Sequence, residues 1–135
     1  MVVMEEMIKT KEISIGHLAC IGDAIYELKI REYFVLQKKL KINDINKEKI
    51  KYVSAKNQEL ILDSLINRQI LNEEELYTIF RARNYKPASK PNNVSIVTYK
   101  KATALESLFG MLYLENNITR INYLIEKIVG ESYDS

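Results

Sequence analysis

Apolar residues recur along the chain at the three- and four-residue spacing of helices that bury one face. No stretch of useful length alternates strictly between apolar and polar residues, so no strand is predicted. Ser14 is expected to cap a long first helix that runs to about Lys38. Five apolar residues are predicted to form the inward face of this helix: Ile15, Leu18, Ile21, Ile25 and Leu28.

Two shorter helical patterns follow the first helix. Asn43 or Asp44 is expected to cap a short basic helix that ends near Lys51. Ser54 is expected to start the next helix, which runs to Arg68. The spacing predicts that five residues of the helix at 54–68 face inward: Ala55, Leu60, Ile61, Leu65 and Ile66.

The rest of the chain predicts one long loop and three more helices. Asn72, followed by glutamates at 73–75, has the arrangement of a reciprocal helix cap, and its helix is expected to run to about Asn84. Both prolines fall in residues 85–97, where no helical face repeats, so a loop is expected there. The last two helices are predicted at about 99–115 and 119–129.

The bulk composition limits the class of protein. A chain of 135 residues has the length of one ordinary domain, so we predict an all-α fold with a single domain over residues 1–135. With 47% hydrophobic and 28% charged residues, the chain is typical of a globular protein. The net charge of +2 is mild, so total charge by itself indicates no nucleic-acid partner.

Targeting signals and cysteine usage favour a cytoplasmic location. No apolar run approaches the roughly 18 residues of a membrane span, so no membrane association is expected. The first twelve residues lack the basic-then-apolar layout of a secretory signal. Cys20 is the only cysteine and cannot form an internal disulfide, and its apolar surroundings predict a small buried side chain.

One segment is chemically one-sided. Between residues 81 and 105 there is no Asp or Glu. The side chains there that could bind phosphate are Arg81, Arg83, Asn84, Lys86, Lys90, Lys100 and Lys101. Such cationic and amide groups are the ones that contact nucleic-acid phosphates. A loop of about a dozen residues is also long for a compact helical domain, and such loops are often functional. The alternative interpretation is a solvated loop that happens to lack acids.

Two carboxylates, Asp23 and Glu106, each lie within an apolar helical stretch. An unpartnered carboxylate removed from water is unfavourable, and a divalent cation held between two of them would offset that cost. Gly22 precedes Asp23 and Gly110 follows Glu106 by one turn, so close packing of the two helices through these glycines would bring the acids together. The alternative is that Asp23 is hydrogen-bonded in the core and Glu106 is exposed on an amphipathic face.

Other catalytic arrangements find less support. His17 is the only histidine, so no zinc set of Cys and His is available, and a Ser-His-acid triad would have to use this one residue. Its place before an apolar run favours a structural hydrogen bond. No Gly-rich phosphate loop is present. The lysines between residues 38 and 51 are interpreted as a solvated face that could extend a surface for binding the nucleic-acid backbone.

Residues 18–27, Leu-Ala-Cys-Ile-Gly-Asp-Ala-Ile-Tyr-Glu, resemble the signature helix of the ribonuclease III family. The short, stand-alone branch called Mini-ribonuclease III is the most similar. Further similar stretches are Val-Ser-Ala-Lys at 53–56, Arg-Asn-Tyr-Lys at 83–86, Thr-Tyr at 98–99 and Ala-Thr-Ala-Leu-Glu-Ser-Leu-Phe-Gly at 102–110. The order and spacing of these motifs over residues 14–125 make the resemblance specific.

The resemblance implies an all-α endonuclease that forms a homodimer and cuts double-stranded RNA with Mg²⁺, for which Mn²⁺ could substitute. Asp23 and Glu106 stand at the family's two central metal-binding acids, where they would also be catalytic. Glu27, four residues after Asp23, would orient Asp23 or a metal-bound water. Ala19 and Thr103 replace acids found in longer family members, so the number of metal ions per site stays open.

For the short branch, the resemblance also implies maturation of the ends of large-subunit (23S) ribosomal RNA in bacteria, with room for a ribosomal-protein helper. The double-stranded-RNA-binding domain of longer relatives is not expected, so the basic loop would position RNA. A rival hypothesis is a catalytically inactive RNA-binding or ribosome-assembly module with the same fold. A second rival, a helical nucleotide pyrophosphohydrolase, would need a repeated Glu-x-x-Glu pattern, which the glutamates at 73–75 do not provide.

Overall fold

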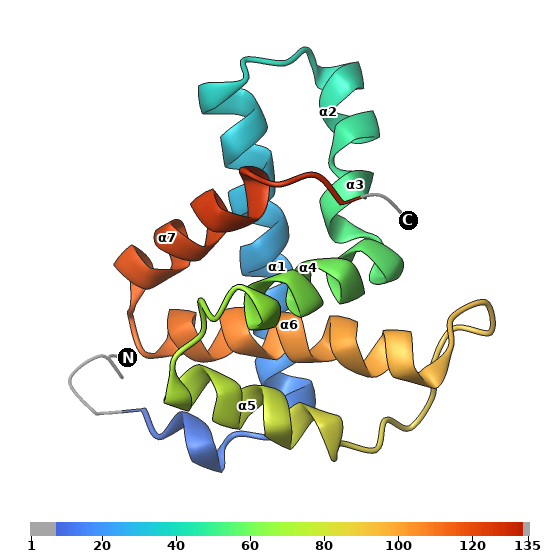
Figure 1. The fold of residues 1–135 in the computed structure, drawn as a ribbon, viewed down its shortest axis with the longest axis vertical. Coiled ribbons are helices and arrows are strands. Elements are labelled where there is room, and N and C mark those ends of the chain that lie inside the picture. The colour runs from blue at the N-terminus through green and yellow to red at the C-terminus, as the bar shows by residue number, and fades with distance from the viewer. Residues whose placement is uncertain (1–7, 134–135) are drawn as a thin grey trace, which may run out of the picture.

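The computed structural model describes residues 8–133, and it is helical with no strand in that part of the chain (Figure 1). The α-helices are α1 (Ile15–Glu32), α2 (Ile42–Glu48), α3 (Ile50–Val53), α4 (Ala55–Asn67), α5 (Glu73–Arg83), α6 (Ile96–Leu114) and α7 (Ile118–Val129). A 3₁₀ turn, η1 (Thr10–Glu12), precedes α1, and a π-helical turn, η2 (Tyr33–Gln37), follows it. Among these described helices, none combines the length and apolar character needed to cross a bilayer. The predicted all-α class is confirmed.

Three predicted helix caps are confirmed. The Ser14 side chain accepts a hydrogen bond from the backbone N–H of His17 at 3.1 Å and lies 2.8 Å from its ring Nδ1, so the only histidine has a structural partner. Ser54 caps α4 in the same way. At α5, the Asn72 side chain accepts from the backbone N–H of Glu75, and the Glu75 carboxylate accepts from that of Asn72, each at 2.9 Å. These caps form because serine and asparagine satisfy backbone donors that a helix start leaves unpaired.

Other predicted boundaries are wrong. Neither Asn43 nor Asp44 caps α2, because that helix begins directly after Lys41 without a side-chain cap, and Asp44 lies in its first turn. The first helix changes to a π-helical turn at Tyr33 before ending. The loop is shorter than predicted, because Ser95 accepts from the backbone N–H of Thr98 at 3.1 Å and starts α6 at Ile96.

Helix α6 is the centre of the fold. In Figure 1 it runs across the middle of the molecule, with α1 passing behind it and α4 and α5 on the near side. It packs against all three helices. Every residue from Ala102 to Leu112 is buried except Glu106, which is half-buried. A helix surrounded in this way is apolar on all sides, so a single carboxylate within it needs a specific reason.

Two glycines allow α1 and α6 to cross in direct backbone contact. A Cβ atom on Gly22 would lie 2.5 Å from the carbonyl carbon of Glu106 and 2.7 Å from the backbone nitrogen of Gly110. A Cβ atom on Gly110 would lie 2.8 Å from the carbonyl carbon of Leu18. Neither position has room for a larger residue. The predicted packing of the two helices through these glycines is therefore confirmed.

The buried face of α1 differs from the predicted one. Its buried residues are Ile15, Leu18, Gly22, Tyr26 and Ile30. Ile21 and Leu28 were predicted to face inward but are 37% and 49% exposed, and Cys20 is exposed rather than buried. The helix must present Gly22 to α6, and this rotates the neighbouring apolar residues toward solvent. The exposed side of α1 therefore carries apolar side chains as well as Asp23.

Candidate active site

The crossing of α1 and α6 brings Asp23 and Glu106 together. Asp23 is exposed, which corrects the expectation that it lies inside the core, whereas Glu106 is half-buried. Desolvation, followed by the charge of Asp23 and a hydrogen bond with it, raises the pKa of Glu106 to about 8. A carboxyl group so close to a second carboxylate holds its proton because two negative charges repel. The two acids predicted from distant segments are thus neighbours.

Gln58 is a third member of this site that the sequence interpretation missed. It lies on α4 with only 3% of its surface exposed, and its side chain lies near enough to the Glu106 carboxyl group to oppose the rise in the pKa of that group. A signal was present in the sequence, because Gln58 shares the helical spacing of the buried residues Ile61 and Leu65. A polar residue at such an inward position needs a partner.

The donor set fits a divalent cation that keeps part of its hydration shell. Residues 8–133 contain no group of three or more His, Cys, Asp or Glu side chains that could hold a metal. The site supplies two carboxylates, one exposed and one that binds a proton when no other cation is near. A cation between them would remove their repulsion, and water could complete its coordination. Asp23 and Glu106 are the residues that could hold it.

Glu27 is held by two cations one helical turn from Asp23. Its Oε2 atom pairs with Arg31 on the same helix and lies 3.4 Å from the Nζ atom of Lys49. Desolvation raises the pKa of Glu27, but the hydrogen bonds and charges of Arg31 and Lys49 outweigh it, so the net pKa is lowered. Glu27 therefore stays ionised between these two cations.

Two residues of the predicted phosphate-binding set have partners in the fold. Arg81 donates to the backbone oxygens of Thr10 at 3.4 Å and Ile13 at 2.6 Å, which attaches the segment before α1 to α5. Lys101 lies 3.0 Å from Asp63. The hydrogen bond that Lys101 donates to Asp63 is the main reason that the pKa of Lys101 is raised. These two cations brace the fold.

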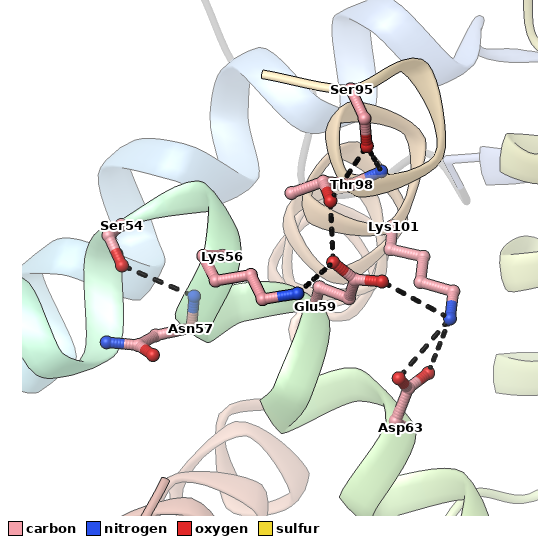
Figure 2. Close-up of polar contacts among 8 residues, drawn as sticks. All are labelled: Ser54, Lys56, Asn57, Glu59, Asp63, Ser95, Thr98 and Lys101. Atoms are coloured by element: carbon pink, nitrogen blue, oxygen red, sulfur yellow. Dashed lines mark hydrogen bonds and ion pairs between the residues drawn. The ribbon is translucent and has the colours of Figure 1, made fainter. Parts of the chain in front are cut away.

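Figure 2 shows Lys101 as part of a polar network that joins α4 to the start of α6. Thr98 donates a 2.6 Å hydrogen bond to Glu59, and this contact is the main cause of the lowered pKa of Glu59. Lys56 and Lys101 lie 3.5 Å and 3.6 Å from the same carboxylate. The network fixes the first turn of α6. The loop before it, residues 84–95, is called the basic loop below.

The other five members of the predicted set lie in the basic loop or on the helix ends that flank it. Four are exposed and Lys100 is half-buried: Arg83, Asn84, Lys86, Lys90 and Lys100. Three of them make long hydrogen bonds to backbone oxygens, Asn84 to Phe80, Lys90 to Pro91 and Lys100 to Arg83, each at 3.4 Å. The four cations and the Asn84 amide are therefore accessible to an anion.

Comparisons with known proteins agree with this architecture. The family model for the ribonuclease III domain matches residues 16–117. A Mini-ribonuclease 3 of Staphylococcus aureus is 38% identical over 112 residues, covering 83% of this chain and 84% of the relative. A Mini-ribonuclease 3 of Enterococcus faecalis is 39% identical over 118 residues, covering 85% and 89%. The crystal structure of a Fusobacterium nucleatum protein superposes with a TM-score of 0.75 at 38% identity, covering 88% of this chain and 93% of that one.

The structure is an all-α domain with paired carboxylates at its central helix crossing, and the family model matches most of its length. Together these two findings define the class of protein. The chain belongs to the ribonuclease III family, in its short Mini-ribonuclease III branch. The family consists of endoribonucleases that generally depend on divalent metal ions, so the chain is an endoribonuclease. The resemblance seen in the sequence motifs is confirmed.

Proposed function

We propose that this protein is a Mg²⁺-dependent endoribonuclease that cuts double-stranded RNA, with Mn²⁺ able to replace Mg²⁺. The proposal rests on one observation, the pairing of Asp23 with Glu106 at the glycine-mediated crossing of α1 and α6. Relatives named Mini-ribonuclease 3 cover most of the chain, which supports maturation of 23S ribosomal RNA ends as the cellular role. A ribosomal protein bound to the same RNA is a compatible helper.

Each residue of the site has a defined task in this proposal. Asp23 and Glu106 would hold the cation, and Gln58, which lies near the Glu106 carboxyl group, would orient it. When bound there, a divalent cation would supply Lewis-acid chemistry: it would lower the pKa of a water molecule and stabilise negative charge on the phosphate and on the leaving 3′-oxygen. Arg31 and Lys49 both contact Oε2 of Glu27, so Oε1 is the oxygen that can accept a hydrogen bond from a water of the cation's shell.

The basic loop supplies contacts to the RNA backbone. Double-stranded RNA is recognised mostly through its shape, phosphates and 2′-hydroxyl groups rather than its bases. The five accessible residues named above are suited to this task, since they are cationic or amide donors near the start of α6. In this proposal Arg81 and Lys101 support the loop from within the fold, through their contacts with Ile13 and Asp63.

We further propose that two copies associate through the flank of α1 that carries Ile21 and Leu28. Ile21 and Leu28 are exposed on this helix, and Cys20, next to Ile21 in the sequence, is exposed as well, which provides apolar surface on the helix that carries Asp23. A symmetric pair would place one carboxylate site against each strand of a duplex and produce a staggered double cut. Sedimentation of the purified protein tests this, and a monomer at micromolar concentration would contradict it.

The central experiment incubates a long perfect RNA duplex with the protein, with and without Mg²⁺ or Mn²⁺. The parent is expected to cleave only with the divalent ion. Asp23→Asn is expected to abolish cleavage while the fold and most RNA binding remain, because it removes a cation ligand at an exposed position. Asp44→Asn, on the exposed first turn of α2, is the matched control and should cleave normally. Duplex binding without cleavage by the parent under any ion would support the inactive module instead.

A further inference from the structure

A cluster of charges on the surface of α1 has no role in the fold's core. Glu27 of α1 binds Arg31, one turn further along the same helix, and Lys49, which lies between α2 and α3. Both cations reach the same carboxylate oxygen, Oε2. One carboxylate therefore holds two cations from different parts of the chain, and the cluster keeps a net positive charge.

The segment that carries Lys49 is fixed against α1. The hydroxyl of Tyr26, which is fully buried in α1, donates a 2.8 Å hydrogen bond to the backbone oxygen of Tyr52 in α3. The Tyr52 ring packs against Phe34 with their centroids 5.8 Å apart. The Lys49 side chain is only 21% exposed, so it is ordered rather than free in solvent. A lysine side chain loses considerable rotamer freedom when it is ordered, so its position indicates a specific use.

This cluster lies on the same stripe of α1 as the proposed cation ligand. Asp23, Glu27 and Arg31 are four residues apart in turn, so they follow one another along one face of the helix. The helical rise places Glu27 about 6 Å and Arg31 about 12 Å from Asp23 along the axis. The two cations are thus one to two turns away from the proposed site of cleavage.

Arg31 and Lys49 have more N–H donors than the Glu27 carboxylate accepts. A guanidinium has five N–H groups and an ammonium three, whereas the contacts here involve one oxygen. Arg31 is exposed at 53% of its side chain, so further donors face solvent. Arg and Lys with available donors are the side chains that bind backbone phosphates, and Arg can do so with two parallel hydrogen bonds.

We propose that Lys49 and Arg31 form a second site for the RNA backbone, which binds a phosphate next to the one that is cleaved, with Glu27 as the residue that positions both cations. This inference rests on the proposed function, because it requires that RNA lies along the Asp23 face of α1. It is separate from the basic loop at the start of α6. The two regions lie on different elements, because Arg31 is on α1 and Lys49 is between α2 and α3, whereas the basic loop leads into α6. In Figure 1, α1 passes behind α6.

The test measures binding rather than cleavage and uses Asp23→Asn protein as the background. Affinity for a perfect RNA duplex is measured by fluorescence anisotropy between about 50 and 200 mM salt, where each lost phosphate contact reduces the slope of log affinity against log salt by about 0.9. Lys49→Ala and Arg31→Ala are each expected to lower the slope by about this amount. The fall in affinity over that range then becomes about 3.5-fold smaller per contact.

Two matched variants remove the same charge from nearby positions. Lys29 lies on α1 but pairs with Glu32 at 3.2 Å, and Lys51 lies on α3 but pairs with Glu48 at 3.0 Å. Lys29→Ala and Lys51→Ala are expected to keep the parental slope. If Lys49→Ala and Arg31→Ala give the same slope as these controls, the second RNA site does not exist.

Glu27→Gln tests the positioning role through the sign of its effect. The change adds one net positive charge, so simple attraction between protein and RNA would strengthen binding. If Glu27 positions Arg31 and Lys49, binding becomes weaker despite the added charge, and tighter binding would overturn this part of the inference. Failure of the background protein to bind duplex RNA at all would contradict the proposed function itself, whereas normal binding with unchanged slopes would contradict only the second site.

Discussion

Replacing Gly22 by alanine tests whether the helix crossing holds the active site together. The added Cβ atom would lie 2.5 Å from the carbonyl carbon of Glu106 and 2.7 Å from the nitrogen of Gly110. Carbon atoms in good contact lie about 3.5–4.0 Å apart, so α1 and α6 must separate by about 1 Å or more. The obstructing atoms belong to the backbone and cannot rotate away. Separation would also draw Asp23 away from Glu106.

Two opposing energies determine the size of the effect. Alanine is favoured over glycine inside a helix by about 1 kcal/mol. Overpacking a well-packed core costs about 1–3 kcal/mol and sometimes more, and a backbone clash belongs at or above the upper end. The net loss in the free energy of unfolding is therefore expected to be about 2 kcal/mol or more. For a domain of this size that corresponds to a fall in Tm of about 8 °C or more.

The matched control is Gly16→Ala, which makes the same change in the same helix. There the added Cβ atom would meet the Tyr85 side chain, whose hydroxyl oxygen lies 2.7 Å away and can move aside. Urea unfolding, thermal melting and duplex cleavage are measured for both variants. Gly16→Ala should stay within about 1 kcal/mol of the parent. A Gly22→Ala protein as stable and as active as the parent would refute the role assigned to the crossing.

Two further predictions concern charge. Without a divalent ion, the raised pKa of Glu106, about 8, means that the folded state binds this proton more tightly than the unfolded state. The resulting stability is present in full below about pH 4.5 and is lost as the pH rises through 8. Urea unfolding between pH 5 and pH 8 should therefore show a smaller loss in Glu106→Gln than in the parent, and equal losses would contradict the assignment. Arg120→Ala should lower the free energy of unfolding by about 3–5 kcal/mol, because it leaves the 1% exposed Glu75 carboxylate without its partner. Lys101→Ala, which breaks a more exposed pair with Asp63, should cost less than about 1 kcal/mol, so equal losses in the two variants would be inconsistent with this ranking.

Local interactions made most helix starts predictable. The caps at Ser14, Ser54 and Asn72 each involve a side chain and a backbone group three residues later, so the short sequence pattern contains all of the needed information. The boundary at Ile96 was missed because Ser95 follows a loop without helical periodicity, although its cap is of the same kind. The start of α2 was missed because that helix begins without a side-chain cap.

The residues of the candidate active site were predictable to different degrees. Asp23 and Glu106 stood out as carboxylates in apolar stretches, and the neighbouring glycines indicated how their helices could meet. Their pairing is in the structure, but their burial differs, since Asp23 is exposed. Gln58 was missed because a single polar residue on an inward helix face gives no indication of its partner, which is 48 positions away in the chain.

Short sequence patterns were enough to predict the helical class, the capped helix starts, the family motifs and the two acids of the candidate site. Those features depend on residues within a turn of one another or on short motifs in a fixed order. Three features became visible only in the folded chain: which face of α1 is buried, the contact of Glu27 with a lysine 22 residues later, and the contact of Lys101 with Asp63 on α4. These outcomes depend on which segments pack together, because the close approach at Gly22 sets the rotation of α1 and so the direction of every side chain on it.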